Sequence, residues 1–574
     1  MAWGIPAYSA PLPLLDKKKE EPLSIVITGV NETLSKQIEL MLSLKQLAGE
    51  QPTRSRLQRL YAKAPQEIRQ ALRPFGYYDV HVTSHMQYKK KRFVFQFHVD
   101  PGPRIHMDRI HIVLEGPGSH DQQLLQAKDA FPLQEGDPLE HARYDQGKEA
   151  LLDTAIQEGY LDAAYTVSRL EVDPAKQRAV VHLVMHTGKR YRLGPVTIEQ
   201  HILDPALVQQ YIPFQQGDPY QARKLLDLKY ALDDSGYFSS VTVSPARQHT
   251  RDDEVPIVVT TTPAKRNLYT AGIGFGTDSG PRGSLGWQNR YLNKQGHTVR
   301  IEGATSLIDS HLTADYRIPI PPLTTDSLSL NGGIQQQDVD DRKSLKGTAG
   351  VGLLRTSGPW QRSLRLNYEY ERYRIGDQEQ EHSTMLLPGL GWSYTDADQA
   401  PIMRHGFHID MDLRGSAKWL ASDLDFLRLY ARAKWIQGLW PDGRMLLRAE
   451  SGANLTSKLV QVPLSQRFFA GGDQSVRGYD YQKLGPKDDD GNVTGGRYLM
   501  VGSAEFEQRV WNKLGVAAFF DMGNAFNTFD EPLKRAAGGG LRFHTPVGVA
   551  RLDVARTIEN KPSWRVHITF GPDL

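Results

Sequence analysis

The spacing of hydrophobic positions divides the chain into two parts. Before residue 265, strand-like runs enclose segments whose apolar residues lie three and four positions apart, as Leu225, Leu228 and Leu232 do. This is the spacing of one face of a helix. After residue 265 the helical spacing disappears, and segments of roughly ten residues alternate apolar with polar or small residues up to the C-terminus. We therefore expect α+β domains followed by an all-β domain.

The first part repeats one pattern three times. Each copy has a helix-like segment, a Gly-Tyr pair and a strand-like run, and the glycines Gly76, Gly159 and Gly236 lie roughly 80 residues apart. Each copy also opens with a strand and closes with a strand that runs into a Pro/Gly/Thr turn. The expected order is strand, helices, strand, strand. We expect each glycine to end a helix in the left-handed conformation and each tyrosine to lie in the core.

The alternation in the second part has two explanations. A soluble sandwich or propeller also alternates, but its second face does not need many charged residues. Here that face carries Arg448 and Glu450 in one segment and Glu505 and Glu507 in another, which fits a wet lumen. The chain after residue 265 is long enough for about sixteen antiparallel strands of about nine to eleven residues. We therefore predict a transmembrane antiparallel β-barrel.

Composition agrees with a barrel. No stretch approaches the roughly 18 uncharged apolar residues of a membrane-spanning helix, so a closed barrel is the remaining route across a bilayer. The 574 residues include no cysteine, which fits a large protein of an oxidising envelope compartment. The net charge of +3 gives no reason to expect nucleic-acid binding.

Two short motifs stand out in the second part. "VRGY", at 476–479, lies in a long glycine-rich stretch, and "FFDMG", at 519–523, lies on a predicted strand whose alternation turns Asp521 toward the lumen. Arg477 lies in a segment long enough to fold back into that lumen, where its planar guanidinium can bond a carboxylate twice. Gly478 would allow a tight turn or a close approach to the wall. Alternatively, Arg477 lies on a surface turn and Asp521 is a solvated lumen residue.

Taken together, these features resemble the superfamily of outer-membrane assembly factors built from POTRA domains and a barrel. Its members carry the first motif in the long loop after the eleventh strand and F-x-D-x-G on the thirteenth strand. Three repeated units, and the fuller stretch "RFFAGGDQSVRGY", most closely resemble the TamA family, the outer-membrane half of the translocation and assembly module. The resemblance implies a disordered N-terminus at 1–21, POTRA domains at 22–102, 103–188 and 189–264, and the transmembrane barrel, of about 16 strands, at 265–574.

The resemblance also implies two sites. In the first, the loop lock, the arginine of the loop pairs with lumen acids and pins the loop inside the barrel. Its residues are Val476, Arg477, Gly478, Tyr479, Glu505, Phe519, Asp521 and Gly523. The second is a lateral gate between the first and last strands, formed by Tyr269, Gly272, Ile273, Gly274, Phe275, Val566, Ile568, Phe570 and Gly571. We expect weak pairing there, because lumen-facing glycines weaken local packing and Pro572 donates no ladder hydrogen bond.

The function implied by the resemblance is the insertion or translocation of autotransporters and other barrel proteins through this gate, without an energy source of its own. The protein would lie in the outer membrane of a Gram-negative cell, with its POTRA domains in the periplasm. Expected partners are a TamB-like protein anchored in the inner membrane, which would dock on the first POTRA domain, unfolded outer-membrane barrel clients, and outer-membrane lipid.

Three alternatives remain at this point. A two-partner-type secretion pore would have two POTRA units, and the main assembly-machine barrel would have more than three. A barrel enzyme would need converging Ser/His or Asp/His groups. His408, Asp410 and Asp412 share one strand face and "DDDGN" at 488–492 resembles a calcium loop, but lumen polarity explains the first set and the second lacks the distal acid of an EF-hand. We therefore expect no catalytic residue, metal or cofactor.

Overall fold

The computed structural model describes residues 23–47, 53–89, 92–398, 402–545 and 548–571. The predicted disordered segment 1–21 and Pro572 lie outside these residues. Within the described ranges, no helix is long and apolar enough to cross a bilayer.

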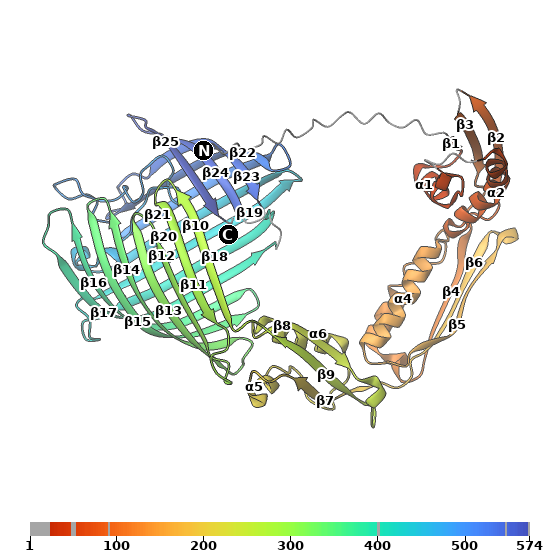
Figure 1. The fold of residues 1–574 in the computed structure, drawn as a ribbon, viewed down its shortest axis with the longest axis horizontal. Helices are drawn as coiled ribbons and strands as arrows, with labels where there is room; N and C mark the ends of the chain where they lie inside the picture. Colours follow the sequence, from red (N-terminus) through yellow and green to blue (C-terminus); the bar gives the residue numbers. More distant parts are fainter. Residues whose placement is uncertain (1–22, 48–52, 90–91, 399–401, 546–547, 572–574) are drawn as a thin grey trace, which may run out of the picture. The chain divides into compact units, whose positions relative to one another are not determined.

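The first part of the chain forms three small units, each a three-stranded sheet with helices (Figure 1). The first contains β1 (Leu23–Thr28), α1 (Glu32–Met41), α2 (Arg54–Leu72), β2 (His81–Lys89) and β3 (Arg92–Asp100). The second contains β4 (His106–Glu115), α3 (Gln122–Asp129), α4 (His141–Gln157), β5 (Ala164–Asp173) and β6 (Arg178–His186). The third contains β7 (Arg192–Glu199), α5 (Pro205–Gln209), α6 (Ala222–Asp234), β8 (Phe238–Pro245) and β9 (Glu254–Pro263).

Each sheet places its closing strand in the centre, in the orders β1-β3-β2, β4-β6-β5 and β7-β9-β8. The opening strand runs parallel to the centre in the first two units, and the central strand alternates buried apolar side chains such as Phe95, Phe97 and Val99 with exposed polar ones. This strand is buried by the helices on one face, as its period-two pattern requires. The order strand, helices, strand, strand is confirmed.

The repeated glycines adopt the left-handed backbone that the sequence predicts, because Gly76, Gly159 and Gly236 have φ values of 85°, 95° and 72°. Tyr160 and Tyr237 are buried. Tyr77 is half-buried and packs against the core cluster of the first unit, and the guanidinium of Arg104 lies 5.7 Å from the centroid of its ring.

Two compact units are distinguished by their internal contacts. One contains the described residues up to 195 with 215–225 and 245–257, and the other contains the barrel with 196–214 and 226–244. Within the second unit, the hydroxyl of Tyr237 donates to the carbonyl of Gly296 in a barrel turn at 2.6 Å. The last Gly-Tyr pair therefore also joins its helix end to the barrel.

The second part is a 16-stranded sheet in which each strand pairs with the next, from β10 to β25 (Figure 1). All neighbouring pairs from β10 to β25 are antiparallel. The strands are β10 (Asn267–Gly276), β11 (Gly280–Asn289), β12 (Thr298–Thr305), β13 (Asp309–Ile320), β14 (Asp326–Val339), β15 (Arg342–Ser357), β16 (Trp360–Ile375), β17 (Glu381–Ala397), β18 (His405–Ser416), β19 (Phe426–Trp440), β20 (Gly443–Leu455), β21 (Tyr498–Arg509), β22 (Leu514–Phe526), β23 (Lys534–Thr545), β24 (Gly548–Thr557) and β25 (Trp564–Gly571). The predicted fold class, three α+β units followed by a barrel of 16 strands, is confirmed.

Strand lengths differ from the prediction in several places, and most in one part of the wall. β15, β16 and β17 have 16, 16 and 17 residues, whereas the sequence analysis expected about nine to eleven, the length that crosses a bilayer. Polar side chains such as Lys343, Arg374 and Glu381 occupy the ends where these strands adjoin. The extra residues therefore carry these three strands beyond the length that crosses a bilayer.

The two faces of the wall follow the predicted alternation. On β22, Leu514, Val516 and Phe520 are exposed on the outside, whereas Phe519 and Asp521 are buried on the inside. The exterior is therefore apolar and the interior carries the charges, which is the arrangement of a barrel that faces lipid.

Candidate functional site: the folded-back loop and the barrel seam

The segment between β20 and β21, residues 456–497, is the long loop that contains the "VRGY" motif. It connects the eleventh and twelfth barrel strands, as the sequence analysis expects. Backbone bridges between Phe468 and Gly496 and between Ala470 and Leu484 give it internal structure. Val476 is fully buried in a cluster that includes wall residues from β21, β22 and β23. The loop therefore packs against the inner wall by its apolar side chains as well as its charges.

Arg477 makes the densest set of polar contacts of the loop with the wall. Its Nε donates to Asp521 Oδ2 at 2.8 Å and its Nη2 to Asp521 Oδ1 at 3.0 Å, and its backbone N–H donates to the same carboxylate at 3.1 Å. Nη1 donates to Glu505 at 2.6 Å and to Asp553 at 3.2 Å. The guanidinium carbon lies 3.4 Å from the centroid of the Phe519 ring. Three acids from three strands therefore surround one arginine that is 5% exposed.

The charges around Arg477 are compensated by further arginines. Arg542 on β23 is fully buried and donates to Glu505 at 2.5 Å, to Glu507 at 2.8 Å and to Asp553 at 2.5 Å. Such compensation is needed because a buried ion without a partner is strongly destabilising. Burial alone would lower the pKa of Arg477, but its hydrogen bonds to Asp521 and the neighbouring carboxylates raise it, so the arginine stays charged.

The other residues of the predicted lock have different contacts. Gly478 has a φ of 95°, and its N–H donates to His567 Nε2 at 3.0 Å. Tyr479 donates from its hydroxyl to the carbonyl of Arg535 at 3.4 Å. Gly523 makes no such contact with the arginine but packs against β21, because a Cβ there would lie 2.7 Å from the carbonyl oxygen of Met500. The structure thus brings Arg477, Glu505, Phe519 and Asp521 together, and their role in fixing the loop stays a prediction.

Several members of this cluster are not among the residues predicted from the sequence. Arg542, Asp553 and His567 lie on the inner faces of β23, β24 and β25 and were not singled out. Alternation along those strands places all three toward the lumen, so the signal was present. What alternation does not specify is which lumen charges lie at the same height, because that depends on the register between strands.

The seam between β10 and β25 is held differently from the rest of the wall. In the part of the chain that the structure describes, no ladder joins these two strands, which are the ends of the 16-strand order. Thr277 donates its N–H to the carbonyl of Ile568 at 3.2 Å and accepts from the N–H of Ile568 through Oγ1 at 3.3 Å. Arg282 on β11 reaches the carbonyl of Phe570 at 3.2 Å.

The register of the seam differs from the one implied by the predicted gate set. Ile568 lies opposite Thr277, just beyond the end of β10. Ile273, which belongs to the predicted gate, lies within β10 and is 94% exposed. Tyr269 and Val566 are likewise exposed on the outside. The first and last strands are far apart in the sequence, and their register is set by closure of the whole barrel, which no local pattern encodes.

The glycines of β10 also act differently from the expectation that they weaken packing. A Cβ at Gly274 would lie 2.7 Å from Arg282 Nε, and one at Gly272 would lie 2.6 Å from the hydroxyl of Ser284. Both glycines therefore make room for side chains of β11. At Gly274 this space lets Arg282 cross β10 and reach Phe570 on β25.

The polar residues that resembled a metal or hydrolase site form hydrogen bonds and ion pairs with their neighbours in the lumen. Asp410 accepts from Arg432 and lies against His408, both at 2.8 Å, and Asp412 accepts from Arg414 at 2.6 Å and from Arg365. Within the described ranges, no group of three or more His, Cys, Asp or Glu side chains is arranged to hold a metal ion. In 488–492, Asp488 accepts from the N–H of Asn492 at 2.8 Å and so closes a turn.

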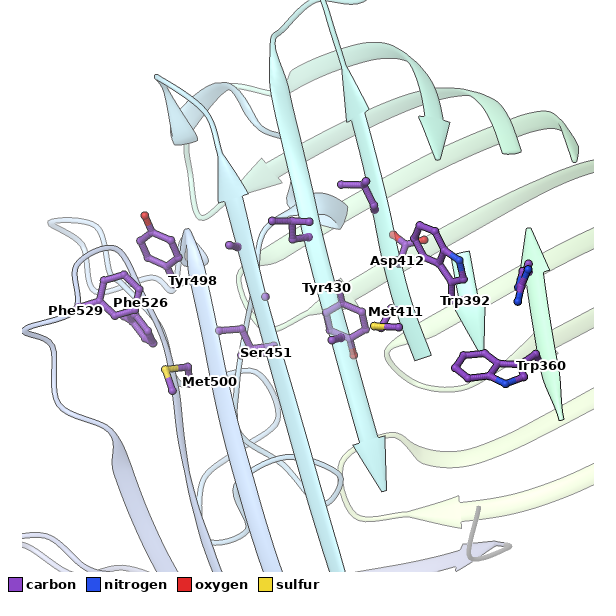
Figure 2. A pocket seen from close by; sticks show the side chains of 17 residues that line it. Trp360, Trp392, Met411, Asp412, Tyr430, Ser451, Tyr498, Met500, Phe526 and Phe529 are labelled. Carbon is purple, nitrogen blue, oxygen red and sulfur yellow. The ribbon is translucent and has the colours of Figure 1, made fainter. Parts of the chain in front are cut away.

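A large apolar hollow lies on the outside of the wall, away from the loop. It measures about 840 Å³, and Figure 2 shows Trp360 and Trp392 at one end and Tyr498, Phe526 and Phe529 at the other. Met411 and Asp412 are neighbours on β18, and because the acid faces the lumen arginines, the methionine faces outward. The hollow is therefore part of the lipid-facing surface.

Three α+β units followed by a 16-stranded barrel, with a loop folded back onto the inner wall, define a POTRA–barrel protein. Residues 292–571 match the family model described as Omp85 superfamily domain. Residues 24–101 match the one described as POTRA domain TamA domain 1, and residues 191–263 match the one described as surface antigen variable number repeat. Residues 292–571 are thus an Omp85 superfamily domain, and POTRA domains precede it in the chain.

Curated relatives are named outer membrane protein assembly factor BamA. The protein from Nitratidesulfovibrio vulgaris is 22% identical over 520 residues, which cover 83% of this chain and 62% of the relative. The protein from Neorickettsia risticii is 20% identical over 508 residues, which cover 83% of this chain and 67% of that relative. The chain therefore spans only about six tenths of the length of the first relative.

Among solved structures, BamA from Haemophilus ducreyi lacking POTRA domains 1–3 superimposes with a TM-score of 0.69 at 15% identity. The match covers 81% of this chain and 99% of that structure. At this level of identity the similarity concerns the fold alone.

Proposed function

We propose that this protein is an outer-membrane assembly factor that inserts or translocates barrel proteins through the seam between β10 and β25. The observation that carries the proposal is the seam itself. Every other neighbouring pair of strands forms a ladder, whereas the described residues of these two edges meet at Thr277, Ile568 and the Arg282–Phe570 contact. An edge with few bonds opens at low cost, and its free N–H and C=O groups can pair with an incoming strand.

Insertion at the seam does not require an energy source. A client strand that adds to β10 gains the backbone hydrogen bonds that the seam lacks, and burial of its apolar face in lipid favours release. The apolar exterior supports a location in the outer membrane of a Gram-negative cell, with the POTRA domains in the periplasm. The names of the curated relatives agree with this class of activity.

Within this class, we infer a TamA-type protein that handles autotransporters. Two features support this finer assignment. The first unit matches the TamA type of first POTRA domain over residues 24–101, and there are three such units. A TamB-like protein anchored in the inner membrane is then the expected partner of that first domain, and unfolded barrel proteins are the expected clients.

A reversible lock on the seam tests the function. The chain has no cysteine, so Thr277→Cys with Ile568→Cys places a single pair across the seam at hydrogen-bonding distance, within the reach of a disulfide. The matched control is Leu330→Cys with Val351→Cys, a directly opposed pair in the β14–β15 ladder. The purified variants in liposomes are given an unfolded autotransporter barrel, and the folded fraction is measured by the gel mobility of unheated samples.

We expect the oxidised seam pair to stop client insertion, the oxidised control pair to leave it unchanged, and reduction to restore it. A secretion pore that conducts through the lumen predicts the opposite, namely unimpaired transport with the seam locked. That result would reject the proposal.

A further inference from the structure

We infer that the loop residues 473–480 hold the two edges of the seam together from the lumen side. The inference rests on the proposed function in one respect, that the seam is the part that opens. The loop contacts both the last strand and the turn of the first hairpin, and its partners there, His567, Arg565 and Asp278, lie outside the predicted lock and gate.

On the side of the last strand, the loop makes two contacts with β25. The N–H of Gly478 donates to His567 Nε2 at 3.0 Å, and the imidazole is 1% exposed. Asp480 forms an ion pair with Arg565, two residues earlier on the same strand face. Because His567 accepts at Nε2, it carries its proton on Nδ1. This part of the loop is thereby fixed to the last strand.

On the side of the first strand, the loop reaches the turn that joins β10 to β11. The N–H of Asp473 donates to Asp278 Oδ2 at 2.6 Å. Gly472 has a φ of 107°, and a Cβ there would lie 2.5 Å from the same oxygen. Only glycine allows this approach, because any side chain would both strain the backbone and collide with the carboxylate.

The turn at Asp278 is also the turn that carries Thr277, the residue bonded directly to Ile568. Between its two attachments the loop is anchored by Arg477 to Asp521. A continuous path therefore runs from the first hairpin through Asp473 and Arg477 to β25. The seam can separate only if one of these contacts breaks. The hydrogen bond from Asp473 N–H to Asp278 is the weakest of them, because it is a single bond.

The test measures the width of the seam without any client. Spin labels on Ile273→Cys and Val566→Cys report the distance between β10 and β25, and both positions face outward, 94% and 49% exposed. In this labelled protein, Asp278→Ala removes the acceptor, and Gly472→Ala displaces the loop while every polar side chain stays in place. Asp442→Ala is the matched control, because this turn acid pairs with Arg509 on another part of the wall.

Pulsed electron spin resonance in lipid nanodiscs should show a single short distance for the labelled parent. We expect Asp278→Ala and Gly472→Ala each to raise the fraction of longer distances about tenfold, the factor for one lost hydrogen bond to a charged acceptor. Asp278→Asn keeps an acceptor oxygen and should restore the parent distribution, as should the Asp442→Ala control.

Unchanged distributions in both Asp278→Ala and Gly472→Ala would overturn the inference, as would equal broadening in Asp278→Asn. Because the readout contains no client, such a result leaves the proposed insertion activity standing. Conversely, the cross-linked seam could leave client insertion unchanged while the loop variants still lengthen the spin-label distances. The two proposals can therefore be rejected independently.

Discussion

The loop after β20 is attached very differently on its two sides. Toward β21, β22 and β24, Arg477 is enclosed by Glu505, Asp521 and Asp553, all buried. Toward the first hairpin, the loop has one backbone bond to Asp278. Buried and fully paired charges hold the loop in one conformation, because any other conformation of the loop would leave a buried charge without a partner. The loop is therefore held firmly to the last strands, and the first hairpin is the part of the seam that can separate from it.

Removing the attachment of the loop to the last strands should give the largest loss of stability. Arg477→Ala leaves Asp521, which is fully buried, with two other acids and no arginine from the loop. We expect the free energy of unfolding to fall by about 3 to 5 kcal/mol, the cost of removing one partner of a buried ion pair. The measurement is the urea dependence of the folded fraction on unheated gels, together with trypsin cleavage after Arg467, which is buried in the parent.

Two variants sharpen that result. Arg477→Lys keeps the charge but loses the paired bonds to Asp521, and it should lie between parent and Arg477→Ala. Arg300→Ala removes an exposed arginine paired with Glu302, and a change below about 1 kcal/mol is expected for a surface pair. If Arg477→Ala and Arg300→Ala had the same free energy of unfolding, the attachment of the loop to the last strands would be no stronger than a surface ion pair.

Breaking the direct seam contact should give a smaller effect. In Gly274→Ala, the new Cβ occupies the path of Arg282 and removes its bond to Phe570. We expect a loss of about 1 kcal/mol in seam closure, the net value of one hydrogen bond, seen as faster hydrogen exchange in the peptide that carries Thr277. Gly283→Ala is the control, because the nearest atom to its Cβ is 4.0 Å away. Equal exchange in the two variants would show that Arg282 does not hold the seam.

A pH dependence is expected on the weak side alone. Burial, and then the charge of Asp278, raise the pKa of Asp473 to about 6, against the opposing effect of Arg448 and Arg282. The closed loop therefore favours the protonated acid. Its contact with the hairpin is strongest below the ordinary carboxyl value of 3.8 and is lost as the pH rises through about 6.

Hydrogen exchange of the peptide that contains Asp473 measures this directly. Protection should fall between about pH 5 and about pH 7.5, after correction for the intrinsic exchange rate. Asp473→Asn should remove the change, since the amide does not titrate. A pH profile that survives in Asp473→Asn would assign the effect to another group.

Much of this architecture could be predicted from the sequence. The repeated Gly-Tyr pairs fixed the order of the three small units, and period-two alternation fixed the barrel and the inward position of Asp521. The same alternation held information about Arg542 and Asp553 that was not used. These predictions succeed because strand period and helix ends are local properties of the chain.

The seam could not be predicted in the same way. That Ile568 meets Thr277 and not Ile273, and that Arg282 crosses Gly274, follow from the stagger of sixteen strands around a closed wall. The contact between Asp473 and Asp278 joins residues nearly 200 positions apart. No periodicity relates them, and only the folded barrel brings them together.

The most direct test of the central claim is client insertion with the seam locked by Thr277→Cys and Ile568→Cys. The account predicts that oxidation stops insertion, that reduction restores it, and that the locked Leu330→Cys and Val351→Cys control inserts normally. Undiminished insertion by the fully cross-linked seam variant would contradict the account.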